Sequence, residues 1–61
     1  MRDPNRLDDF YDRLKKVHKE SHSQLRFGQW MVCVLGDMQA NGRDPFFPEE
    51  DEMIKFIENW R

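Results

Sequence analysis

Few side chains of this 61-residue chain could carry chemistry, and the clearest pair is His18 with His22. The two histidines lie one helical turn apart, a spacing that can bind a metal ion. The glutamate that follows the first histidine in metalloprotease helices is absent here, and no third ligand is evident. His18 also projects towards the apolar stripe of its expected helix, where a histidine commonly hydrogen-bonds a carbonyl group. We therefore predict no metal site.

The other candidates for chemistry are the lone cysteine, Cys33, and the acidic run from Glu49 to Glu52. A nucleophilic thiol needs an electropositive setting and a neighbouring base, whereas Cys33 stands between two valines. Consecutive carboxylates at the start of a helix usually compensate the helix dipole. The three glycines are scattered, so they form no phosphate-binding loop. We predict that the protein is not an enzyme and uses no cofactor.

The size and composition of the chain favour one small domain that spans residues 1–61. A core of this size leaves about 3 to 5 kcal/mol of net stability, and a single cysteine cannot form a disulfide within the chain. No segment approaches the roughly 20 apolar residues that cross a bilayer, and the N-terminal residues lack the apolar segment of a signal peptide. The expected location is the cytoplasm, without contact to a membrane.

The spacing of apolar residues predicts an all-α fold with three helices, at about residues 4–21, 25–40 and 48–60. Asp3-Pro4 and Pro48 are suitable helix starts, and Asn41-Gly42 is a suitable helix end. The first helix carries a stripe made of Leu7, Phe10, Tyr11, Leu14 and Val17. The stripe of the last helix consists of Met53, Phe56, Ile57 and Trp60, with Ile54 beside it.

The middle helix is apolar around most of its circumference, so we expect it to lie between the other two and to be the most buried. Its predicted interior residues are Phe27, Trp30, Met31, Val34, Leu35 and Met38. A strip of small or uncharged residues is left over and would let another helix approach closely. We predict that this strip binds a protein partner, with a homodimer as one possibility. It consists of Gln29, Cys33, Gly36 and Ala40.

Residues 43–48 should form a stiff connector, because prolines restrict the backbone. Phe46 and Phe47 are available to fill the core from this connector. Arg26 is poorly placed for the dipole of the middle helix, so we expect it to pair with Asp44, Glu50 or Asp51. A structural role is therefore predicted for Arg26, Trp30, Asp44, Pro45 and Phe46.

The charge distribution bears on the class of partner. The chain has a formal net charge of −2, and its last third is acidic, with Glu49, Glu50, Asp51, Glu52 and Glu58 against Lys55 and Arg61. Such a surface repels nucleic acid and suits a basic protein, so we predict that Glu49 to Glu52 contact a protein partner. The alternative is a small nucleic-acid-binding regulator of helix-turn-helix type, with Arg26 and Gln29 near the start of its recognition helix.

The chain carries three motifs in this order: Leu25-Arg26-Phe27-Gly28-Gln29, Asp44-Pro45-Phe46 and Glu50-Asp51-Glu52. In them the chain resembles a family of short uncharacterised proteins found mainly in phages, prophages and their Firmicute-type hosts. It departs from the family pattern at Cys33, where the family has asparagine. The resemblance implies no catalytic residues. It implies a protein–protein interaction module that acts in a bacterial cell, for instance by inhibiting a host defence protein or a nucleic-acid-handling protein.

Overall fold

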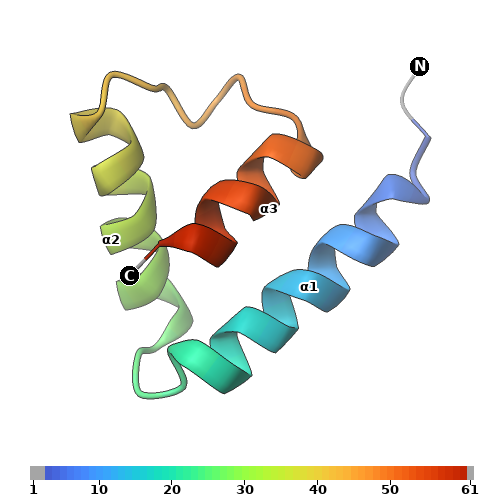
Figure 1. The fold of residues 1–61 in the computed structure, drawn as a ribbon, viewed down its shortest axis with the longest axis horizontal. Coiled ribbons are helices and arrows are strands. Elements are labelled where there is room, and N and C mark those ends of the chain that lie inside the picture. Colours follow the sequence, from blue (N-terminus) through green and yellow to red (C-terminus); the bar gives the residue numbers. More distant parts are fainter. Residues whose placement is uncertain (1–2, 61) are drawn as a thin grey trace.

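The computed structural model describes residues 3–60, which form three helices and no strand. They are α1 (Arg6–Ser21), α2 (Phe27–Ala40) and α3 (Glu50–Asn59). The predicted all-α, three-helix fold is confirmed, and each helix begins two residues later than expected. Figure 1 shows α3 lying between α1 and α2. The molecule is flat, with extents of 34 × 27 × 18 Å.

The helix boundaries follow from local hydrogen bonds. The Asp3 carboxylate accepts the Asn5 N–H (3.0 Å) and the Asp3 carbonyl accepts the Arg6 N–H (3.2 Å), so a turn precedes α1. At the other end of α2, Gly42 has φ of +80°, a left-handed conformation that glycine adopts without strain. Its N–H and that of Arg43 bond carbonyls in the last turn of α2. The expected helix end at Asn41-Gly42 is therefore correct.

The core is small and is shared by α2 and α3. Among residues 3–60, five side chains are buried: Trp30, Val34, Met38, Ile54 and Ile57. α1 buries no residue fully, but it covers one side of this cluster with Phe10, Leu14 and Val17. The end of α3 is tied to α2 where the Trp60 indole N–H donates to the Asp37 carboxylate at 2.5 Å.

The prediction that the middle helix is the most buried of the three is not confirmed. α2 lies at one side of the fold in Figure 1, while the last helix has neighbours on both sides. α2 does bury Trp30, Val34 and Met38 completely. However, Phe27 at its start is 56% exposed and Val32 on its far side is 75% exposed. Only one arc of α2 therefore faces the core, because no element of the described chain covers the opposite arc.

Two histidines fix Trp30 in the core. The imidazole of His18 stacks on the indole with ring centres 4.7 Å apart, and that of His22 lies 5.8 Å away. His22 also contacts the ring of Trp60 at 5.1 Å. The His18 Nε2–H donates to the Leu25 carbonyl at 2.8 Å, because a carbonyl can only accept. Both histidines thus join the end of α1 to α2, which accounts for their positions without a metal ion.

A bidentate ion pair joins α1 to α3. Arg13 Nη2 and Nε donate to the two Glu58 oxygens at 2.6 and 2.9 Å. Hydrogen bonding from Arg13 lowers the pKa of the Glu58 carboxyl below its usual range, and the bond to Glu58 raises the pKa of Arg13. A carboxyl whose pKa is lowered on folding stabilises the protein at any pH above its pKa in the unfolded chain. This stabilisation is lost as the pH falls through the pKa of the carboxyl in the folded protein.

We therefore expect Glu58→Gln to reduce the difference in stability between pH 7 and pH 3. Because both side chains are about one-third exposed, solvent screening keeps the effect small. Urea unfolding at the two pH values measures it. Lys55→Gln is the control, since Lys55 is exposed on the same helix. A wild-type pH dependence that survives in Glu58→Gln would contradict this assignment.

Candidate functional site

The connector between α2 and α3 exposes two aromatic side chains that the sequence placed in the core. Phe46 is 83% exposed and Phe47 is 74% exposed. Their rings contact each other edge to face, with centres 5.0 Å apart. The prediction that Phe46 and Phe47 fill the core is therefore wrong. Ile54 and Ile57 of α3 belong to the core cluster instead.

Local hydrogen bonds hold the aromatic pair in place. The Asp44 side chain accepts the N–H of Phe46 at 2.9 Å, and the Asp44 carbonyl accepts the N–H of Phe47 at 3.3 Å. Pro45 and Pro48, both half-buried, flank the pair and restrict the backbone. The structural role predicted for Asp44 and Pro45 is thus to shape a turn that presents Phe46 and Phe47 to solvent.

The acidic start of α3 is only partly available to a partner. Glu50 is half-buried and accepts from Arg6 Nε at 2.7 Å, and Glu52 accepts from Arg43 at 3.0 Å. The Asp51 carboxylate accepts the N–H of Glu52. Glu49 and Asp51 are exposed. Glu50 and Glu52, two of the four predicted partner-binding acids, therefore already form ion pairs with arginines of this chain, and Glu49 is not free of contacts either.

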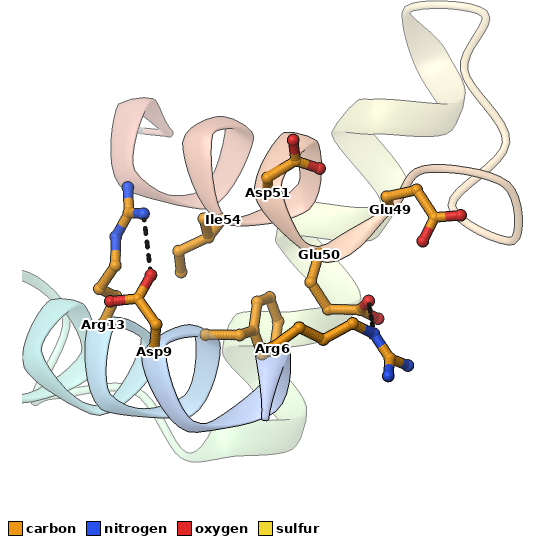
Figure 2. Close-up of a pocket in the computed structure, with 8 residues that line it drawn as sticks. Arg6, Asp9, Arg13, Glu49, Glu50, Asp51 and Ile54 are labelled. Carbon is orange, nitrogen blue, oxygen red and sulfur yellow. Dashed lines mark hydrogen bonds and ion pairs between the residues drawn. The ribbon is translucent and has the colours of Figure 1, made fainter. Parts of the chain in front are cut away.

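A groove of about 390 Å³ runs between α1 and the start of α3 (Figure 2). Its floor is apolar, from Phe10 and Ile54, and its sides are charged. Figure 2 shows Arg6 meeting Glu50 across the groove, while Asp51 points away from α1. The remaining lining residues are Asp9, Arg13 and Glu49. Arg6 and Arg13 of α1 are each paired with a carboxylate of α3, so these ion pairs hold the two helices together across the groove.

The second predicted binding surface is the strip on α2. Gln29, Cys33, Gly36 and Ala40 are all exposed, on the side of α2 opposite Trp30, Val34 and Met38. Gln29 has a structural task as well, because its Oε1 accepts the Arg26 N–H at 2.9 Å and caps the helix. The structure therefore separates the predicted partner-binding residues into two groups on different helices, one uncharged and one acidic.

The carboxylate partner expected for Arg26 is not found within residues 3–60. Arg26 is exposed, and the ion pairs of the described residues use Arg6, Arg13 and Arg43. Asp44 instead bonds the connector backbone. Trp30, in contrast, is buried as predicted. Arg26 contributes to structure through its backbone N–H, which donates to Gln29.

His18 and His22 do not come together with further metal ligands. Within residues 3–60 no group of three or more histidine, cysteine or carboxylate side chains could hold an ion. Among the same residues, no helix combines the length and the apolar character that crossing a membrane requires.

The exposure of Phe46, Phe47 and Val32 was not predicted from the sequence, yet their side chains are the most exposed large apolar groups of the described chain. The two prolines around Phe46 and Phe47 were the available signal, since a stiff connector can hold aromatic groups away from a core as well as in it.

Comparison of the chain with protein-family models, with curated proteins and with solved structures gave no match.

Proposed function

We propose that the protein is a non-enzymatic interaction module of phage or prophage type that binds a cytoplasmic protein of its bacterial host and inhibits it by binding. The observation that carries the proposal is the exposed pair Phe46 and Phe47. Leaving two phenylalanines in water forgoes about 1.5 to 3 kcal/mol for each side chain. Exposed aromatic groups on a preorganised turn are typical anchors of protein–protein interfaces.

The charges around the aromatic pair indicate the chemistry of the partner. Asp44 and Asp51 are exposed close to it in the sequence, and Arg43 is already paired with Glu52. A partner should therefore offer an apolar pocket for the two rings and basic side chains around the pocket, because complementary charges steer association and fix orientation. The resemblance to short phage proteins supports a partner of the host, for instance a defence protein or a basic protein that handles nucleic acid.

Capture of the partner from a lysate of the host, with tagged protein, tests this function. We expect the double variant Phe46→Ser with Phe47→Ser to lose a captured partner by about 30-fold or more, the loss typical of interface anchors. Its melting temperature should stay close to that of the wild type, since substitutions of exposed side chains usually change stability by less than about 0.5 kcal/mol.

The control is Tyr11→Ser, which removes an aromatic side chain that is 57% exposed on α1. This variant should capture the partner as the wild type does. A second variant, Asp51→Lys, should slow association and make it less sensitive to salt. Equal capture by the wild type and the Phe46/Phe47 double variant would overturn the proposal.

A further inference from the structure

We infer that Asp44 is the positioning residue of the exposed aromatic pair. Its side-chain oxygen accepts the Phe46 N–H and thereby sets Phe46 and Phe47 in one arrangement before a partner binds. The inference rests on the proposed function, because it concerns the same surface. It goes further by separating two properties of Asp44, namely the acceptor that orders the connector and the negative charge that steers a basic partner.

Residues 44–47 form a tight turn. The Phe47 N–H donates to the Asp44 carbonyl at 3.3 Å, which closes a four-residue β-turn. Phe46, at the third position, lacks the positive φ that a type II turn requires there, so the turn is of type I. Aspartate at the first position and proline at the second are favoured in such a turn. Asp44 and Pro45 occupy these two positions.

The Asp44 side chain adds a second hydrogen bond to this turn. Its Oδ1 accepts the Phe46 N–H at 2.9 Å, whereas the backbone bond of the turn is longer, at 3.3 Å. An aspartate that bonds the N–H two residues later forms an Asx-turn, which fixes the backbone between the two residues. This bond belongs to a side chain, so a substitution can remove it without changing the backbone.

The order of the aromatic pair has to come from the connector itself. Phe46 is 83% exposed and Phe47 is 74% exposed, so packing on the core contributes little to it. The ring of Pro45 sets its own φ, and Pro48 disfavours helical backbone at Phe47. Neither proline fixes Phe46, whose N–H is held by Asp44. With the backbone set in this way, the two rings contact each other at an interplanar angle of 78°.

A fixed aromatic pair should bind more tightly than a mobile one. A partner that binds one arrangement meets only the fraction of molecules that already have it, so the apparent dissociation constant rises as this fraction falls. One hydrogen bond typically changes such an equilibrium by about 3- to 10-fold. Loss of the Asp44 acceptor should therefore weaken binding by about 3- to 10-fold, which is less than the effect of removing both rings.

Nuclear magnetic resonance of the full chain without a partner gives the first test. Asp44→Ala removes the acceptor, whereas Asp44→Asn removes the charge and keeps an oxygen that forms the same turn. In Asp44→Ala the Phe46 N–H should exchange with solvent about 3- to 10-fold faster, and the cross-peaks between the two rings should weaken. Asp44→Asn should restore both signals. Wild-type exchange and wild-type cross-peaks in Asp44→Ala would overturn the inference.

Asp12→Ala is the matched control, because it removes one exposed carboxylate from α1. It should leave the exchange of the Phe46 N–H unchanged. The hydrogen bonds of Asp44 lie within the connector, so the chemical shifts around Trp30 should also stay those of the wild type in Asp44→Ala. Changes that spread to Trp30 would indicate a general loosening of the fold and would contradict a positioning role.

The affinity for the partner captured through Phe46 and Phe47 gives the second test. At high salt, where charge steering is screened, Asp44→Ala should raise the dissociation constant by about 3- to 10-fold. Asp44→Asn and Asp12→Ala should bind like the wild type. If the Phe46/Phe47 double variant loses the partner and Asp44→Ala does not, the inference fails and the proposed function stands. If the double variant binds like the wild type, the proposed function itself fails.

Discussion

Replacing Trp30 by alanine should lower the free energy of unfolding by about 3 to 5 kcal/mol. Trp30 is completely buried and is in contact with His18, His22 and Phe27. Its removal leaves a cavity where the end of α1 meets α2. The loss equals the whole net stability of about 3 to 5 kcal/mol that a core of this size provides. A thermal scan followed by circular dichroism and started at low temperature should therefore show no cooperative transition for this variant.

Trp30→Phe separates the contribution of the ring from that of its polar atom. The indole Nε1 of Trp30 is buried and has no hydrogen-bond partner among the described residues. A buried donor without an acceptor costs about 1 to 3 kcal/mol. Phenylalanine removes this donor and keeps an aromatic ring against His18, so its cost should be less than half that of Trp30→Ala. Equal destabilisation by the two substitutions would contradict the assignment of Trp30 Nε1 as unpartnered.

The burial of Trp30 could be predicted from the sequence, and the exposure of Phe27 could not. Both residues lie on the apolar stripe of α2. Phe27 is the first residue of the helix, however, and no element of the described chain covers its ring completely. A periodic pattern identifies one face of a helix, but it does not say how far along the helix the neighbouring elements extend. The ends of a stripe are therefore predicted less well than its middle.

The candidate site was also predicted only in part, because helical spacing does not show which elements pack on one another. The uncharged strip on α2 follows from helical spacing alone, and Gln29, Cys33, Gly36 and Ala40 are indeed all exposed. The exposure of Phe46 and Phe47 depends on whether α3 closes the core without them. This is a tertiary property, and short-range patterns carry no information about it. The ion pairs Arg6 with Glu50 and Arg13 with Glu58 likewise join residues more than 40 positions apart.

The orientation of α3 differs from the predicted one by a small rotation. The sequence placed the stripe at Met53, Phe56, Ile57 and Trp60, with Ile54 at its edge. In the structure Ile54 and Ile57 are almost completely buried, whereas Met53, Phe56 and Trp60 are half-buried. The reason is that α3 lies between α1 and α2 (Figure 1), so its most buried line is the one that faces both helices. A stripe packed against a single neighbour would have its centre elsewhere.

This orientation predicts that Ile54→Ala lowers the free energy of unfolding by about 2 to 5 kcal/mol, the range for a fully buried isoleucine. Ile54 also lines the groove between α1 and α3 that the pair of Arg6 and Glu50 bridges (Figure 2). Its truncation therefore weakens the contact between these helices. Met53→Ala at the neighbouring, half-buried position should cost less than half as much, because less apolar surface leaves the core.

Urea unfolding in a constant concentration of a stabilising osmolyte compares the two variants, since excluded solutes strengthen burial and keep a weakened domain folded. The comparison is sharp because Met53 and Ile54 are adjacent in one helix and both become alanine, so helix propensity changes little and burial decides the difference. Equal losses, or a larger loss for Met53→Ala, would place the centre of the buried face on the predicted stripe. α3 would then pack against one helix only, and the position of the connector that presents Phe46 and Phe47 would change with it.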